Sequence, residues 1–188
     1  VAERRPPLIE LGGVPVTPPP GAFLQATAEG EAALVRLVSE ACAGAGRIAD
    51  LYAGIGTFSF ALARAAPVYA AEQDAAAVAA LVAARNGAAG LKQIEAEMRD
   101  LVRRPLGPGE LARFDAVVFD PPRAGAARQV EELARSKVPL VVAVSCNPAT
   151  FARDSRTLAD GGYRLERVTP VDQFLWSAHV ELVATFRR

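Results

Sequence analysis

From residue 21 onward, short apolar runs alternate with segments in which apolar residues recur at helical spacing. Residues 138–144 are almost all apolar, which is typical of a central parallel strand buried on both faces. In contrast, the apolar residues after Thr27 recur every three or four positions up to about residue 43, and Thr27 can cap the helix that this spacing predicts. The complete pattern predicts strands over residues 47–51, 68–71, 93–97, 115–119, 138–144, 163–168 and 180–186, and helices over residues 28–43, 57–66, 74–85, 128–136 and 149–159.

This alternation of strands and helices predicts an α/β fold. Repeated strand–helix–strand units join parallel strands through right-handed crossovers, which place helices on both faces of one sheet. We therefore expect a Rossmann-like, doubly wound sheet that is mostly parallel. The segment between the last two predicted strands has no helical pattern, so the last strand is expected to be antiparallel.

Residues 1–20 are interpreted as a lead-in segment before a main domain that spans residues 21–188. Gly12-Gly13 separates two short apolar runs, and a Gly-Gly pair in this position favours a β-hairpin. An isolated hairpin is marginally stable, so we expect it either to cover the main domain or to lead in from an upstream region. Because the sequence starts with Val1, we expect part of a longer protein or a processed chain.

The composition limits the class of protein. With 188 residues, 51% of them hydrophobic, the chain favours one domain that buries roughly 70% of its unfolded surface. No apolar run approaches the ~20 residues of a membrane span and no signal peptide opens the sequence, so a cytoplasmic protein without membrane contact is expected. Two Cys and one His predict neither a disulfide framework nor a metal site. The 21 basic and 21 acidic residues cancel, which argues against binding of nucleic acid through bulk charge alone.

The first predicted strand leads into a glycine-containing turn that opens a helix. Gly54 and Gly56 allow the backbone to approach a ligand closely, and the helix start offers free N–H groups. A tight turn without a ligand has the same pattern, so these two glycines alone leave both interpretations open. Ser59 occupies the third glycine position of a dinucleotide fingerprint, which disfavours NAD.

Acidic residues follow three successive strands and favour the ligand interpretation. Asp50 precedes the glycines, Glu72 ends the second strand, and Asp100 follows the third. A carboxylate placed like Glu72 can accept both ribose hydroxyl groups, and Asp100 can accept a hydrogen bond from an adenine amino group. Each acid alone is more often a solvated surface charge. Together they suit a cationic nucleoside without phosphates, which describes S-adenosylmethionine.

Two polar motifs follow later strands. Asp120-Pro121-Pro122-Arg123 combines an acid at a strand end with a rigid turn that suits a flat polar target. Ser145-Cys146-Asn147-Pro148 places Cys146 just before a helix start, where the helix dipole can favour a thiolate. Free Cys is commonly buried and inert. That description fits Cys42 in its Ala-rich helix end, but it does not fit Cys146 in a polar turn.

The last predicted strand begins with His179-Val180-Glu181, shortly after Asp172 and Phe174. His179 and Glu181 share one face of the strand. A thiol with a separate carboxylate is typical of nucleophilic catalysis assisted by a base. For His179, a structural hydrogen bond within its loop is an equally good interpretation.

Together these motifs resemble the S-adenosylmethionine-dependent RNA uracil-C5 methyltransferases, which form 5-methyluridine in rRNA and tRNA. The resemblance covers residues 21–188. The most specific part of the resemblance is the Ser145–Pro148 stretch together with Ala152-Arg153-Asp154. The resemblance also includes Phe23-Leu24-Gln25, the turn around Gly54 and the motifs at Asp120 and Glu181. It implies a class I methyltransferase fold, S-adenosylmethionine as cofactor, and an rRNA or tRNA partner.

The resemblance also implies a role for each motif. Cys146 would attack C6 of the target uracil, C5 would then accept the methyl group, and Glu181 would remove the C5 proton so that Cys146 can leave. The target base would have to be flipped out of its stack. Cofactor contacts, or contacts that hold the two substrates together, are expected from Gln25, Asp50, Tyr52, Gly54, Gly56, Thr57, Glu72, Asp100 and Asp120. RNA contacts are expected from Arg123, Arg153, Phe174 and His179.

The sequence departs from the family pattern at Thr27, Ala53 and Leu175, where the family usually has Asn, Cys and Pro. It also lacks the family's usual N-terminal OB-like RNA-binding domain and the upstream Cys residues that hold an iron–sulfur cluster in some members, so it resembles an isolated catalytic domain. Two other functions remain open. One is an amino-group RNA or DNA methyltransferase that uses the Asp120-Pro121-Pro122 turn without a thiol, and the other is a nucleotide-binding module without catalysis.

Overall fold

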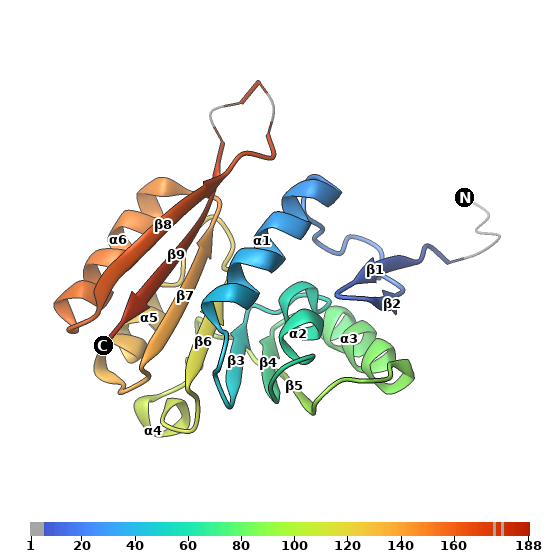
Figure 1. Ribbon diagram of the computed structural model, residues 1–188, viewed down its shortest axis with the longest axis horizontal. Helices are drawn as coiled ribbons and strands as arrows, with labels where there is room; N and C mark the ends of the chain where they lie inside the picture. The colour runs from blue at the N-terminus through green and yellow to red at the C-terminus, as the bar shows by residue number, and fades with distance from the viewer. Residues whose placement is uncertain (1–5, 175, 178) are drawn as a thin grey trace.

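The computed structural model describes residues 6–174, 176–177 and 179–188 of the 188-residue chain. In these residues, seven strands form one central sheet (Figure 1): β3 (Ile48–Leu51), β4 (Val68–Glu72), β5 (Ile94–Met98), β6 (Ala116–Phe119), β7 (Leu140–Ser145), β8 (Arg164–Val171) and β9 (Glu181–Arg187). The strand order is β5-β4-β3-β6-β7-β9-β8. Strands β3 to β7 pair in parallel, whereas β9 is antiparallel to both β7 and β8. The predicted α/β fold with an antiparallel last strand is confirmed.

Helices cover both faces of the sheet. On one face lie α1 (Ala28–Ala41), α2 (Thr57–Leu62) and α3 (Ala75–Gly87), and on the other lie α4 (Pro108–Leu111), α5 (Ala127–Arg135) and α6 (Pro148–Asp160). Successive strand residues point to opposite faces, so in β3 the side chain of Ile48 joins the first core and that of Ala49 joins the second. The two cores hold the strands so that the polar turns after β3, β4, β6 and β7 meet at one edge of the sheet.

Three differences between the predicted and the observed elements are larger than two residues. Helix α2 ends at Leu62 and not at residue 66, because the carbonyl of Ala63 accepts a hydrogen bond from the amide of Lys92 at 2.7 Å and the chain turns toward β4. Helix α4 was not predicted, because its four residues are too few to show a helical period. Strand β8 continues to Val171, where it pairs with Glu181 of β9.

The predicted hairpin around Gly12-Gly13 forms from β1 (Ile9–Leu11) and β2 (Val14–Val16). Both glycines have positive φ (55° and 77°), as a two-residue hairpin turn of this kind requires. The turn lies directly on α2, where a Cβ on Gly12 would be 2.7 Å from the amide nitrogen of Ala61. Arg64 donates to the carbonyl of Gly12 at 3.1 Å, so the hairpin packs as a cover on α2. Residues 1–5 of the predicted lead-in lie outside the described residues.

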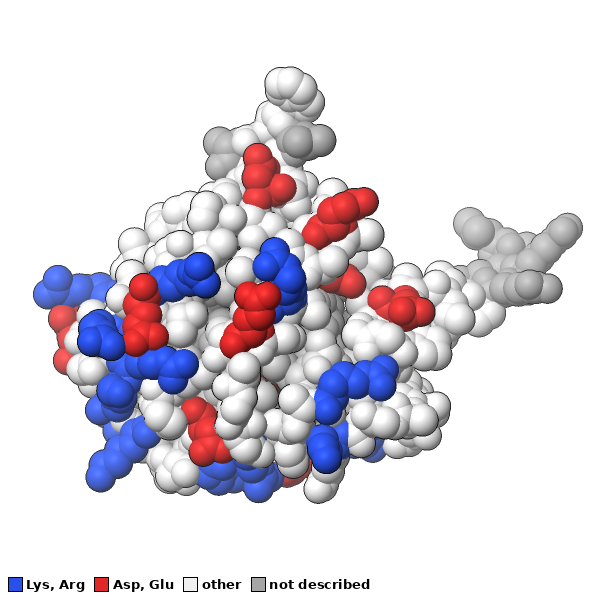
Figure 2. All heavy atoms as spheres, in the orientation of Figure 1, with Lys and Arg blue, Asp and Glu red and all other residues white. Residues whose placement is uncertain are grey.

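Charged side chains are mixed on the face that Figure 2 shows. Basic side chains gather mainly toward the end where β8 begins and β9 ends, with acidic side chains among them. At that end Glu166 pairs with both Arg164 and Arg187, at 2.9 and 3.0 Å. This face therefore has no uniformly positive surface. Among the helices that the structure describes, none has the length and apolar character needed to cross a membrane.

Candidate active site

The turns at the carboxyl ends of the parallel strands surround a cavity of about 400 Å³. Many of the residues singled out from the sequence line it: Gln25, Tyr52, Gly54, Thr57, Glu72, Asp120, Arg123, Cys146 and Glu181. The structure thus brings the glycine turn, the Asp-Pro-Pro turn and the cysteine turn around one space. The remaining predicted site residues, Asp50, Gly56, Asp100, Arg153, Phe174 and His179, are not among the described residues that line this cavity.

The glycine turn after β3 is built on a buried carboxyl group. Asp50 is completely buried and accepts a hydrogen bond from the hydroxyl of Ser59 at 2.5 Å, while its Oδ1 has no partner among the described residues. Burial raises the pKa of Asp50 to about 7, against the opposing effect of the Ser59 hydrogen bond. Gly56 has φ 104°, and a Cβ there would be 2.6 Å from the Phe60 ring, so this position needs glycine for conformation and for space.

Glu72, at the end of β4, holds the same turn from the other side. Its Oε2 accepts from the amide of Gly54 at 3.0 Å, and its Oε1 accepts from the amide of Asp74 at 2.8 Å. Asp74 in turn caps α3 by accepting from the amide of Ala76. The carboxylate of Glu72 is therefore fixed at the cavity wall. Its predicted contact with a ribose stays a prediction.

The loop after β5 contributes to the cavity through Arg99, Leu101 and Val102. The carboxylate of Asp100 instead accepts from the amides of Val102 and Arg103, at 2.9 and 3.1 Å, and thereby shapes the turn. The predicted adenine contact of Asp100 stays a prediction.

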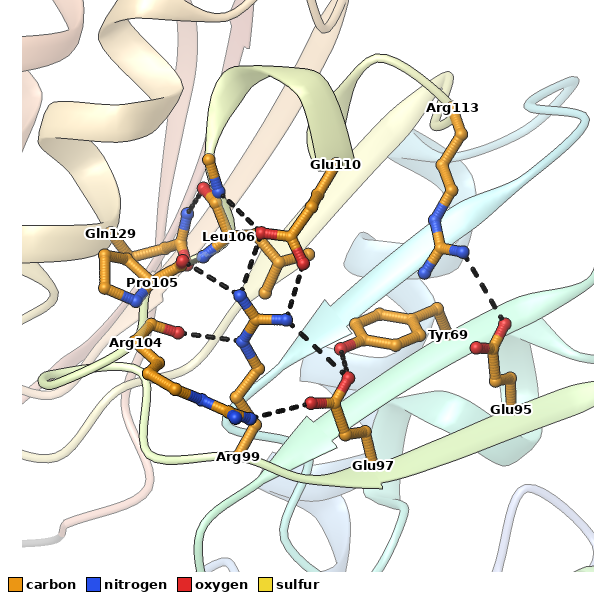
Figure 3. Close-up of polar contacts among 11 residues, drawn as sticks. Tyr69, Glu95, Glu97, Arg99, Arg104, Pro105, Leu106, Glu110, Arg113 and Gln129 are labelled. Atoms are coloured by element: carbon orange, nitrogen blue, oxygen red, sulfur yellow. Dashed lines mark hydrogen bonds and ion pairs between the residues drawn. The ribbon is translucent and has the colours of Figure 1, made fainter.

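Arg99 fastens this loop to α4, as Figure 3 shows. Its guanidinium forms a bidentate salt bridge with the carboxylate of Glu110, at 2.7 and 2.9 Å, and donates to the carbonyls of Arg104 and Pro105. Glu97, which also accepts from the hydroxyl of Tyr69, lies 3.7 Å from the same guanidinium. Arg99 was not singled out from the sequence, because a charged residue after a strand gives no sign of such a network.

On the other side of the cavity, the turns after β6 and β7 are tied together. Asn147 caps α6 by accepting from the amide of Ala149 at 3.1 Å, and its side-chain amide donates to the carbonyl of Arg123 at 3.0 Å. Thr150 donates to the same carbonyl at 3.3 Å. These bonds hold Cys146, which is half-buried, next to the turn that carries Asp120.

The electrostatics around Cys146 differ from the expectation that a helix start favours its thiolate. The pKa of the Cys146 thiol is raised, first by burial and then by the nearby carboxyl groups of Glu181 and Asp120. Burial, Glu181 and Asp50 together raise the pKa of Asp120 to about 8, and burial raises the pKa of Glu181. Burial and, after it, the two carboxyl groups therefore oppose the thiolate that the helix start was expected to favour.

The two carboxyl groups are joined through side-chain amides. Gln25 donates to Oδ2 of Asp120 at 3.4 Å. Gln173, on the connection between β8 and β9, donates to Oε1 of Gln25 at 2.9 Å and to Oε1 of Glu181 at 3.4 Å. Sequence reasoning missed Gln173, because a polar residue in a loop is normally solvated and no pattern indicates that this one is buried.

The residues predicted to contact RNA fall into two groups. Arg123 lies 3.4 Å from Nδ1 of His179, whose ring is 6.0 Å from that of Phe174, so these three gather beside the cavity. Arg153 instead binds Asp154 at 2.8 Å and the carbonyl of Ala124 at 3.0 Å, which ties α6 to the Asp-Pro-Pro turn. The RNA contacts of all four residues stay predictions. Leu175, one of the departures from the family pattern, lies outside the described residues.

Within the described ranges, no group of three or more His, Cys, Asp or Glu side chains is placed to hold a metal ion. The second cysteine, Cys42, is buried at the end of α1, and burial raises the pKa of its thiol to about 12. Its predicted burial is confirmed.

Comparisons with known proteins relate the whole fold to RNA methyltransferases. A family model described as tRNA (uracil-5-)-methyltransferase matches residues 18–188. An uncharacterized RNA methyltransferase of Caulobacter vibrioides is 59% identical over 184 residues, which make up 98% of this chain and 44% of that protein. A 23S rRNA (uracil(1939)-C(5))-methyltransferase of Chromohalobacter salexigens is 41% identical over 172 residues, 90% of this chain and 35% of that protein. The chain thus spans less than half the length of these relatives.

Solved structures agree with the sequence comparisons. The tRNA (uracil-54, C5)-methyltransferase of Pyrococcus abyssi, in complex with S-adenosyl-L-homocysteine, superposes with a TM-score of 0.81 and 34% identity over 95% of this chain and 43% of that one. A magnesium protoporphyrin IX methyltransferase of Synechocystis, with a TM-score of 0.64 and 17% identity over 85% of this chain and 79% of that one, shares the fold alone. The resemblance drawn from the motifs is confirmed, and the chain belongs to the tRNA (uracil-5-)-methyltransferase family.

Proposed function

We propose that the protein transfers a methyl group from S-adenosylmethionine to C5 of a uridine in RNA, through a covalent bond between Cys146 and C6. The observation that carries this proposal is the meeting of Cys146, Asp120 and Glu181 in the cavity that also contains the glycine turn. A thiol and a carboxyl group that line one cavity suit addition to a base followed by proton removal. Family membership supports the same reaction class.

The residues around the glycine turn fit a cationic nucleoside. A Cβ built on Gly54 meets no atom within 4 Å, so the turn leaves open space for a ligand. Glu72 and Asp120 place carboxyl groups at the cavity wall, and the buried Oδ1 of Asp50, just before the turn, has no hydrogen-bond partner among the residues that the structure describes. When bound, S-adenosylmethionine supplies a methyl group on a positively charged sulfur. We expect Glu72 to orient the ribose and the acidic wall at Asp120 to offset the sulfonium charge.

The chain's own residues would then carry the remaining chemistry. Cys146 gives its proton to solvent as its sulfur bonds to C6 of the flipped uracil. The electron pair of the C5–C6 double bond moves toward the C4 carbonyl as an enolate, which makes C5 nucleophilic. After C5 accepts the methyl group, Glu181 removes the C5 proton, the double bond between C5 and C6 re-forms, and the sulfur leaves with its electron pair. The net change at the base is replacement of one proton by one methyl group. Arg123, beside the cavity, is placed to meet RNA.

Cofactor affinity is expected to rise with pH. In the free protein the pKa of Asp120 is about 8, so this carboxyl group is mostly neutral below that pH. A bound sulfonium favours the ionised carboxylate, so binding releases a proton. The association constant should therefore rise by up to about tenfold per pH unit below about pH 8 and level off above that pH. Isothermal titration calorimetry at several pH values measures this slope.

The matched control is S-adenosylhomocysteine, which has the same nucleoside and amino-acid groups but a neutral sulfur. Its affinity should show a shallower slope over the same range. An Asp120→Asn variant, which cannot ionise, should reduce the difference between the two ligands. Identical slopes for both ligands in the unmodified protein would contradict a carboxyl group that responds to the sulfonium.

The function itself is tested by mapping 5-methyluridine in the rRNA and tRNA of cells with and without the gene that encodes this chain. Loss of the modification at one uridine, restored by the wild-type gene and not by a Cys146→Ala gene, supports the proposal and identifies the target. An unchanged map in both RNA classes contradicts it.

A further inference from the structure

We infer that Gln173 is a positioning residue for the proposed base, and that it acts by fixing the carboxyl group of Glu181 relative to Gln25. The inference rests on the proposed function. Gln173 is not among the described residues that line the cavity, and the residue is only 6% exposed. Gln173 therefore acts through the side chains to which it donates hydrogen bonds, and not through contact with the substrates.

The hydrogen bonds of Gln173 have a defined direction. Its side-chain amide has two N–H groups, and the two acceptors within reach are Oε1 of Gln25 at 2.9 Å and Oε1 of Glu181 at 3.4 Å. Gln25 extends this hydrogen-bond network by donating to Asp120. Hydrogen bonds between side chains thus connect Asp120, in the Asp-Pro-Pro turn, to Glu181, the proposed base. The two ends lie on β9 and on the turn after β6, which no backbone ladder joins directly.

A glycine in α1 makes room for this side chain. A Cβ on Gly30 would be 2.8 Å from Cβ of Gln173 and 2.9 Å from Oγ1 of Thr27, which caps the helix. Gly30 is buried in the first turn of α1. Only a residue without a side chain lets Gln173 lie against the helix and keep its amide between Gln25 and Glu181. The position of the base is therefore set partly by the first turn of α1.

This arrangement separates two steps of the proposed reaction. Attack by Cys146 and methyl transfer do not use Glu181, whereas release of the product does. A displaced Glu181 should slow proton removal from C5 while leaving adduct formation intact. Loss of Gln173 should therefore make the methylated protein–RNA adduct accumulate, which a general loss of stability would not do.

The test uses the complete protein with a uridine-containing RNA and methyl-labelled S-adenosylmethionine. Gln173→Leu keeps much of the side-chain volume and removes both hydrogen bonds. We expect kcat to fall about tenfold, which is less than the roughly 10²- to 10⁴-fold contribution of a general base because Glu181 itself is retained, with the KM for RNA changed less than about twofold. A labelled adduct that resists denaturing electrophoresis should appear. Gln93→Leu, at an exposed position, is the matched control and should behave like the wild type.

A second variant tests the same idea from a distance. Gly30→Ala adds one methyl group in a helix, where Ala is intrinsically favoured over Gly, and pushes against Gln173. It should reproduce the adduct, and because it acts on Glu181 through Gln173, its added effect on product release should be smaller in the Gln173→Leu background than in the wild type. If the melting curve shows that Gln173→Leu does not fold, the adduct measurement on Gly30→Ala tests the inference instead.

The outcomes distinguish this inference from the proposed function. If both variants release product at the wild-type rate without adduct while activity still requires Cys146, Gln173 does not position the base and the proposed function stands. If the wild type forms no adduct with 5-fluorouridine RNA, the covalent mechanism itself fails. Accumulated adduct in both variants, with normal adduct formation, supports the inference.

Discussion

Replacement of Cys146 by Ala is expected to abolish methyl transfer to uridine. C5 of uracil is a poor nucleophile until a group adds to C6, and Ala cannot form that bond. The rate should fall by about four orders of magnitude or more, the scale on which loss of a covalent nucleophile slows other enzymes. Cys146 is half-buried in a turn, so a single lost sulfur should leave the fold intact. Methyl transfer from labelled cofactor to RNA, with a melting curve for each protein, measures both points.

The control for this substitution is Cys42→Ala. Cys42 is 3% exposed in the core beneath α1 and does not line the cavity, so its loss should lower stability slightly and leave activity unchanged. RNA that contains 5-fluorouridine should form a stable adduct with the wild type and with Cys42→Ala, but not with Cys146→Ala. Full activity of Cys146→Ala would instead favour amino-group methylation at the Asp120-Pro121-Pro122 turn, which needs no thiol.

Replacement of Glu181 by Gln should trap the reaction after methyl transfer. Glu181 is 3% exposed, yet its carboxyl group reaches the cavity wall, where Gln keeps the shape and cannot accept the C5 proton. Turnover should fall by about 10²- to 10⁴-fold, the usual contribution of a general base. A single-turnover experiment should show one labelled methyl group per protein, held in a protein–RNA adduct.

The matched substitution is Asp120→Asn, which changes the other carboxyl group near Cys146. It should weaken cofactor binding without trapping the methylated adduct. If Glu181→Gln releases product normally and Asp120→Asn traps the adduct, the base is Asp120. The pair of variants therefore assigns the proton-removal step to one of two neighbouring acids.

Much of the fold could be predicted because its signals are local. The apolar run of β7 and the spacing in α1 follow from residues close together in the sequence, and Thr27 caps α1 as predicted, accepting from the amide of Gly30 at 2.9 Å. Helix α4 has no such signal. The end of α2 depends on Lys92, thirty positions away from Leu62, so no local pattern could reveal it.

The site residues that lie in motifs at strand ends could be predicted from the sequence. Cys146, Glu181 and Asp120 lie on different turns, and the parallel order of the sheet brings them together. The raised pKa of Cys146 could not be foreseen, because it depends on burial in the folded chain and then on carboxyl groups that approach from β9 and from the turn after β6. Gln173 was missed for a related reason, since its partners Gln25 and Glu181 come from opposite ends of the sequence.

The position of β9 inside the sheet has a consequence for how the molecule assembles. β8 precedes β9 in the sequence, but within the described sheet its backbone ladder is with β9 alone. β8 therefore joins the sheet only through β9, whether the two strands pair before or after β9 docks on β7. Each registered residue of β9 lies more than 35 positions from its partner on β7, as in Ser145 opposite Leu182. Closing the chain over this distance costs conformational entropy before the ladder forms. Glu181 lies on β9, so a chain in which β9 has not docked on β7 has its thiol in place without the proposed base beside it.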